Sequence, residues 1–137
     1  MTDTGPRHKL LIPVSPGAEA PLYQQIIDGI KREISAGRLA PDALLPSFRA
    51  LAEQLLVSVI TVKRAYEELE REGLIYRKQG LGTFVSPNGV GRSRQLKMRE
   101  AKRLLVEALR TGIEAGLGTD ELMEMVGELM ERQEVKR

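Results

Sequence analysis

The side chains best suited to chemistry are cations and hydroxyls near two predicted helix starts. Ser47 precedes an apolar helical pattern and Arg49 lies in its first turn, while Lys63 and Arg64 follow Ser58 closely. A serine before a helix can cap its free backbone N–H groups. Helix N-termini and arginine both favour anionic or acceptor groups, so Arg49 is a candidate for contact with a phosphate or a base.

Each of these cations also has a plainer interpretation. Arg49 can be an ordinary solvated charge of a first helical turn. Lys63 and Arg64 can reach a phosphate or the edge of a guanine. Arg64 can equally pair with Glu67 or Glu68 on its own helix. The residues alone leave these interpretations open.

Groups that carry out nucleophilic or acid–base chemistry are scarce. The chain has no Cys and one His, His8. Disulfides, thiolate nucleophiles and Cys/His zinc sites are therefore excluded, and a His-based triad or metal cluster is nearly so. The sequence also lacks motifs that cradle phosphates or activate a nucleophile. We therefore expect no catalytic site, no metal and no cofactor.

Length and charge define the scale of the protein. A chain of 137 residues has room for one domain with a core plus an extension, and its formal net charge of +2 does not by itself demand a nucleic-acid partner. Residues 10–12 form only a brief apolar run, and nothing approaches the roughly 18 apolar residues of a membrane span. We expect a soluble cytoplasmic protein without a membrane partner, and the absence of Cys agrees with this expectation.

Residues 55–75, LLVSVITVKRAYEELEREGLI, combine two opposed local preferences. The β-branched run VSVITV favours a strand, whereas KRAYEELEREG favours a helix that stops at Gly73. A strand here would have no turn chemistry on its C-terminal side. A tight turn at Leu56 and Val57, followed by a Ser58 cap, gives a continuous helix instead. Its buried stripe would be Val62, Ala65, Tyr66 and Leu69.

The β-branched residues at the start of this helix lie outside the buried stripe. Val59, Ile60 and Thr61 are then exposed beside the two cations. Apolar side chains at such a position can contact thymine methyl groups, and the Thr61 hydroxyl can contact a phosphate or a base. For Val59 the alternative is packing against Leu55, which would make the turn only structural.

The remaining elements of residues 10–86 have clear local signals. An amphipathic helix is predicted over 21–37 and a second over 48–55, with an extended piece between them. Two short strands, 74–78 and 83–86, are joined by QGLG, where Gly80 and its neighbour Gly82 permit positive φ. This order is that of a winged helix-turn-helix. The aromatic residues are expected to pack in the core and not to stack on bases: Tyr23, Phe48, Tyr66 and Phe84.

The C-terminal part predicts a linker followed by a helical hairpin. PNGVGRS, residues 87–93, has linker composition, and 94–137 shows two apolar stripes separated by a Gly-Leu-Gly break, with Thr119 as the expected cap. Two such helices bury too little apolar surface alone, so we predict that they form a dimer interface. The interface residues would be Met98, Ala101, Leu105, Ala108, Leu122, Met125, Val126 and Leu129.

A basic cluster follows the predicted linker. It contains Glu100 and six cations: Arg92, Arg94, Lys97, Arg99, Lys102 and Arg103. A phosphate-facing patch and a solvated helix face are equally good interpretations of this pattern.

Several motifs together resemble the DNA-binding domain of GntR-type bacterial transcription regulators. These motifs are PLYQQI, LPSFRALA, TVKRAYEELEREGLI and GLGTFV, and the likeness covers roughly residues 10–86. The short two-helix tail is similar to the YtrA branch of that family. The local patterns and the resemblance together predict a mainly α fold with a small β-hairpin: a flexible lead (1–9), a winged helix-turn-helix domain (10–86), a linker (87–93) and a two-helix C-terminal dimerisation hairpin (94–137).

The same resemblance implies a sequence-specific transcription regulator, a repressor, that binds double-stranded DNA. A homodimer would recognise an inverted-repeat operator, with the helix after Ser58 in a major groove and the glycine-rich wing beside it. The implied contacts are Ser47, Arg49, Ser58, Val59, Ile60, Thr61, Lys63, Arg64 and Gly80. Whether a small-molecule effector exists stays open, and the alternative function is a winged helix that contacts proteins without binding DNA.

Three residues depart from the family pattern. Leu56 occupies the turn position where Gly is usual, and a left-handed conformation there would cost about 1–2 kcal/mol. Asp42 also stands where Gly is usual. Val59 replaces an Arg that many relatives direct at bases, which alters the expected sequence preference of the helix but not its role.

Overall fold

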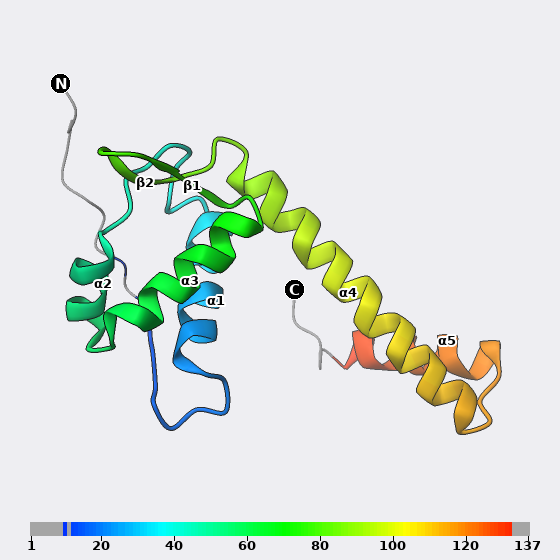
Figure 1. Cartoon of the computed structure of the whole chain (residues 1–137). Helices are drawn as coiled ribbons and strands as arrows, with labels where there is room; N and C mark the ends of the chain where they lie inside the picture. Colours follow the sequence, from blue (N-terminus) through cyan, green and yellow to red (C-terminus); the bar gives the residue numbers. More distant parts are fainter. Residues whose placement is uncertain (1–9, 11, 133–137) are drawn as a thin grey trace. The chain divides into compact units, whose positions relative to one another are not determined.

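The computed structural model describes residue 10 and residues 12–132, so the predicted lead (1–9) lies outside the described part. Its elements in chain order are α1 Leu22–Ser35, α2 Phe48–Leu55, α3 Val59–Arg71, β1 Ile75–Lys78, β2 Gly82–Val85, α4 Gly89–Glu114 and α5 Thr119–Glu131 (Figure 1). The predicted fold class, mainly α with a small hairpin, is confirmed. The chain divides into two compact units, Met1–Gln95 and Leu96–Arg137.

The core of the first unit forms where α1, α2 and α3 pack together. The stripe predicted for α3 is buried in full, and the isoleucines of α1 meet it from the other side. Tyr66 is the largest fully buried side chain, and its hydroxyl donates a hydrogen bond of 2.8 Å to the carbonyl of Pro46. The Tyr66 ring packs edge-on against Phe48, with 5.3 Å between centroids. Core packing of Tyr66 is therefore confirmed.

The β-branched start of α3 is helical, as predicted. Ser58 is the N-cap, and its Oγ accepts a hydrogen bond of 3.1 Å from the Thr61 N–H. The cap satisfies a backbone group that a helix start otherwise leaves free. Burial of the apolar stripe of α3 then stabilises the helix and outweighs the local β propensity of its first residues.

The turn between α2 and α3 is strained at Leu56. This residue has φ 59° and ψ 45°, the left-handed conformation, and its side chain is 91% exposed. The left-handed conformation considered for this turn position is therefore present. This backbone conformation is unfavourable for a residue with a Cβ, and the exposed Leu56 side chain gains too little burial energy to offset the cost.

Replacing Leu56 with Gly should stabilise the protein by about 0.5–1 kcal/mol. Glycine removes the left-handed penalty, although it also gives the unfolded chain more conformational freedom. Urea denaturation followed by circular dichroism would measure the change. Glu67→Gly, at an exposed position inside α3, is the matched control and should destabilise by about 1 kcal/mol. A Leu56→Gly protein no more stable than the parent would contradict the strain.

The wing is a two-stranded antiparallel hairpin with a third extended segment beside it. Ile75 pairs with Val85 and Lys78 with Gly82, close to the predicted strands. Leu44 forms a bridge to Phe84 on the other edge of β2. Gly82 has φ 124°, a backbone conformation that favours glycine, and a Cβ there would come within 2.8 Å of the end of the Leu44 side chain.

Asp42, the other predicted departure, is held by the wing. It has φ 63°, and its carboxylate accepts a hydrogen bond of 2.7 Å from the Tyr76 hydroxyl. This hydrogen bond, followed by partial desolvation, raises the pKa of Tyr76. The contact offers Asp42 a partner in a conformation where glycine would be easier.

The predicted linker over 87–93 is wrong, because α4 begins at Gly89. Ser93 is only 1% exposed and shares a hydrogen bond of 2.7 Å with Ser35, and Arg92 Nε donates to the Glu72 carbonyl at 2.8 Å. A Cβ on Gly89 would lie 3.1 Å from the Ile34 side chain. The small residues that look like a linker therefore permit close packing against the ends of α1 and α3, and this packing outweighs their poor helix propensity.

The second unit contains the rest of α4 and α5. Gly116 follows α4 with φ 92°. The predicted Thr119 cap is wrong: Gly118 is the N-cap residue, and its N–H donates to the Glu121 carboxylate at 3.2 Å. Leu122 is half-buried beside Gly112 and Leu117. Of the predicted interface, the other seven residues are exposed: Met98, Ala101, Leu105, Ala108, Met125, Val126 and Leu129.

Candidate nucleic-acid interface

The start of α3 carries an exposed apolar pair beside a cation. Ile60 is 78% exposed, Val59 is 40% exposed, and Lys63 is exposed one turn later. Because Ile60 is the more exposed of the two, it is the stronger candidate for an apolar contact with a partner. The lower exposure of Val59 leaves its packing alternative in place.

The hydroxyls at this helix start contact each other. Ser58 Oγ and Thr61 Oγ1 lie 2.7 Å apart, and Ser58 also caps the helix. A hydroxyl has one donor and two acceptor positions, so each side chain keeps capacity for a further hydrogen bond. Both hydroxyls are thus oriented by the helix before any partner binds.

Arg64 is oriented by an aromatic ring. Its guanidinium carbon lies 3.7 Å from the centroid of Tyr23 on α1, within the range of a cation–π contact. Glu68, one of the two expected partners, instead forms an ion pair with Arg71. A stacked guanidinium still presents its N–H edge, so Arg64 keeps the chemistry needed to contact an acceptor.

The start of α2 is built as the sequence predicts. Ser47 is the N-cap, and its Oγ accepts a hydrogen bond of 3.1 Å from the Ala50 N–H. Arg49 is exposed at the second position of the helix. An exposed cation beside the positive end of a helix favours an anionic partner.

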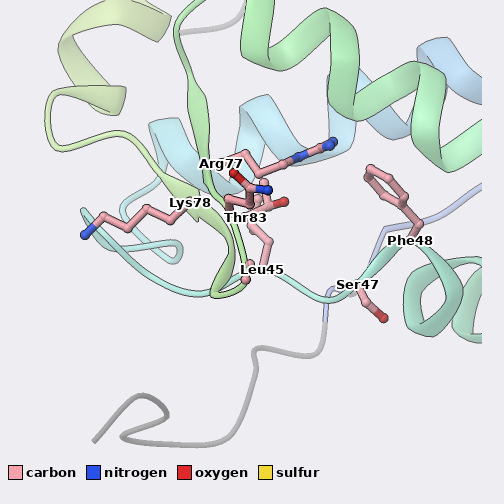
Figure 2. A pocket seen from close by; sticks show the side chains of 9 residues that line it. Leu45, Ser47, Phe48, Arg77, Lys78 and Thr83 are labelled. Atoms are coloured by element: carbon pink, nitrogen blue, oxygen red, sulfur yellow. The ribbon is translucent and has the colours of Figure 1, made fainter.

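An open hollow of about 340 Å³ lies between the start of α2 and the wing (Figure 2). Leu45 and Phe48 give it apolar walls, while Arg77, Lys78 and the glycine-rich turn with Gly80 supply its wing side. Sequence reasoning missed Arg77 and Lys78. Their signal was two adjacent cations in a strand next to the wing turn, but nothing in the sequence placed that strand against α2.

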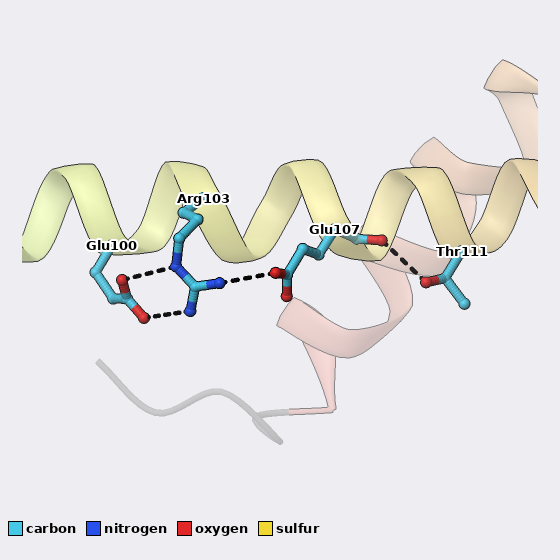
Figure 3. A network of polar contacts seen from close by, with 4 residues as sticks. All are labelled: Glu100, Arg103, Glu107 and Thr111. Carbon is cyan, nitrogen blue, oxygen red and sulfur yellow. Dashed lines mark hydrogen bonds and ion pairs between the residues drawn. The ribbon is translucent and has the colours of Figure 1, made fainter.

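Two members of the basic cluster are occupied within the chain. Arg92 donates to the Glu72 carbonyl, as described above. Arg103 lies between Glu100 and Glu107 on α4 and forms an ion pair of 2.7 Å with each (Figure 3). Hydrogen bonds to Glu100 are the main cause of the raised pKa of Arg103. These two cations are therefore poor candidates for phosphate contact, and the others are exposed: Arg94, Lys97, Arg99 and Lys102.

Metal binding and membrane insertion find no support in the described part of the chain. No group of three or more His, Cys, Asp or Glu side chains there could hold a metal ion. Within the same residues, every helix is too short or too polar to cross a membrane.

Comparison with known proteins identifies the family. The model for "Bacterial regulatory proteins, gntR family" matches residues 22–85. The HTH-type transcriptional repressor YtrA of Bacillus subtilis (strain 168) is 34% identical over 119 residues, which are 87% of this chain and 92% of YtrA. The chain belongs to the GntR family. The predicted resemblance, including the likeness to YtrA, is confirmed.

Solved structures of transcription regulators share the fold. A transcriptional regulator from Oenococcus oeni has a TM-score of 0.68 and 27% identity, over 85% of this chain and 97% of that one. YtrA from Sulfolobus acidocaldarius, a GntR-family transcription factor, has a TM-score of 0.55 and 31% identity, over 68% of this chain and 98% of that one. The likeness therefore extends over nearly the full length of both of these solved chains.

Proposed function

We propose that this GntR protein is a transcriptional repressor that binds an inverted-repeat operator as a homodimer. The observation that carries the proposal is the surface of the helix-turn-helix. Arg49 and Lys63 lie exposed at the starts of its two helices, together with Ile60. The B. subtilis relative is itself named an HTH-type transcriptional repressor, which supports a regulator and not an enzyme.

Each part of this surface has a distinct task in the proposed complex. The start of α3 enters a major groove, where Ile60 meets a thymine methyl group and Lys63 meets a phosphate or a guanine edge. Arg49 contacts the backbone or a base at the start of α2. The wing approaches the neighbouring backbone or minor groove through Gly80, which carries no side chain to block it.

The second unit supports the homodimer. Both α4 and α5 carry large apolar side chains that are exposed to solvent. The described residues of this unit contain no further element to cover them. A second copy would cover them with the same surface, as two-fold symmetry requires. A two-fold dimer presents two copies of α3, which predicts half-sites about 34 Å apart, or a multiple of that distance, in inverted orientation.

Replacing Arg49 with Ala tests the DNA-binding proposal. The probe is a duplex selected by the full-length protein from a random library, and fluorescence anisotropy measures the affinity. Binding should weaken by about 1–3 kcal/mol for each bidentate base interaction that the variant no longer makes. Arg32→Ala removes the same charge from the last turn of α1 and should change little. Failure to select any duplex, or equal affinity of a folded Arg49→Ala protein, would overturn the proposal.

Replacing Ile60 with Ser should change sequence preference more than affinity. An apolar contact with a thymine methyl carries no phosphate interaction, so non-specific binding should stay nearly constant while discrimination at one thymine position falls. Competition between the selected duplex and a duplex with that thymine changed to uracil, which lacks the methyl, measures the effect. Lys63→Ala is the contrast if Lys63 binds phosphate, since it should weaken both duplexes alike. Equal reductions for specific and non-specific DNA in Ile60→Ser would make Ile60 structural.

A further inference from the structure

We propose that Arg77 is a further DNA-contacting residue, that Phe48 positions it, and that the hollow between the wing and α2 receives the sugar–phosphate backbone. This inference rests on the proposed function and adds a contact that neither helix of the helix-turn-helix provides. It also joins the wing and the start of α2 into one binding surface.

Arg77 is directed from the wing toward α2. It is the third residue of β1, where it pairs with Thr83 of β2, and its side chain is exposed. Its guanidinium carbon lies 5.1 Å from the centroid of the Phe48 ring. Figure 2 shows that Arg77 and Lys78 extend from the hairpin in different directions, as neighbours on a strand do, and that Lys78 leads away from Phe48.

Phe48 can orient the Arg77 guanidinium because its own ring is fixed by packing against the core. It packs edge-on against Tyr66, which is buried and whose hydroxyl is bonded to the Pro46 carbonyl. A guanidinium over an aromatic face within about 6 Å gains a cation–π contact and loses part of its freedom before binding. A pre-oriented cation has less entropy to lose when it meets a phosphate.

The hollow suits both chemical parts of a nucleic-acid backbone. The half-buried Phe48 provides apolar surface for a deoxyribose, while the exposed Arg77 provides the charge for a phosphate. The described lining residues include two cations and no carboxylate, so an anion meets no opposing charge from them. Phe48 immediately precedes Arg49, so a backbone that follows the start of α2 would pass this place.

The salt dependence of binding isolates the role of Arg77. For the dimer, the slope of log affinity against log salt should become shallower by about 2 in Arg77→Ala, because each of two subunits neutralises one phosphate fewer. Affinity should fall by about tenfold for each phosphate interaction removed, and by similar factors for the selected duplex and for random duplex. Arg77→Lys should recover most of the slope but less of the affinity, since lysine keeps the charge and lacks the planar stacking group.

Matched variants test whether the change in salt dependence comes from the Arg77 charge and whether Phe48 contributes to binding. Arg32→Ala removes a cation from the last turn of α1, which is not part of the lining of the hollow, and should leave the slope unchanged. Phe48→Leu, checked for folding by thermal denaturation, should weaken binding without changing the slope, because the charge stays while its support is removed.

An unchanged slope in Arg77→Ala would overturn the inference. If the wild type binds and Arg49→Ala weakens binding, that unchanged slope leaves the proposed function intact. A wild type that binds no duplex removes both the inference and the proposed function.

Discussion

Operator affinity is expected to fall by about 10³–10⁵ when salt rises from about 50 mM to about 200 mM. The reason is counterion release: every phosphate neutralised by a protein cation frees a bound cation from the DNA, and added salt opposes that release. Arg49, Lys63 and Arg77 give a dimer six exposed cations, and about six phosphate contacts correspond to the lower end of this range.

The measurement is a salt titration by fluorescence anisotropy with the selected duplex. Sedimentation of the protein alone at both salt concentrations is the control, since a salt-dependent dimer would weaken binding without any phosphate contact. A steep loss of affinity from an unchanged dimer supports the DNA-binding surface. A flat response across the same range would mean that the exposed cations of α2, α3 and the wing do not bind phosphates.

Much of the first unit was predictable because its signals are local. Ser47 and Ser58 each cap the helix that begins at the next residue, by accepting a hydrogen bond from the backbone N–H three residues later. The periodicity of Val62 and Tyr66 identifies the face of α3 that must be buried. The same logic resolved the β-branched start of α3. A short strand there would have had to end without a turn, whereas a capped helix needed only its neighbours in sequence.

What escaped prediction depends on contacts between distant residues. Gly89 and Ser93 have the composition of a linker, and only packing against α1 shows why they are helical. Arg77 lies 29 positions after Phe48 in the sequence, so their cation–π contact appears only once the wing has folded beside α2. At Gly118 the error was local, because the helix begins without a hydroxyl cap and the Glu121 carboxylate instead accepts a hydrogen bond from the Gly118 N–H.

Removal of the second unit should have the largest effect on operator binding, provided that the fragment ends after Gln95. The contacts of Ser93 with Ser35 and of Arg92 with Glu72 show that the first turns of α4 complete the DNA-binding unit. A fragment of residues 1–95 should therefore remain folded. Ending at Pro87, at the edge of the linker that the sequence suggested, should lower stability by about 1–3 kcal/mol, because it leaves Ile34 and the Glu72 carbonyl without their covering groups.

The 1–95 fragment should sediment as a monomer and bind the operator about 10²–10⁴ times more weakly, while its affinity for an isolated half-site changes little. In a dimer the second half-site is bound intramolecularly, and a monomer forgoes this advantage although its own DNA-facing surface is complete. Leu105→Glu combined with Val126→Glu in the full chain is the matched test, since charges on exposed apolar positions of α4 and α5 should separate the subunits while every DNA-facing residue stays. If either protein stays dimeric, or binds the full operator as tightly as the wild type, the exposed faces of the second unit do not hold the dimer, and the apolar surface there serves a different partner.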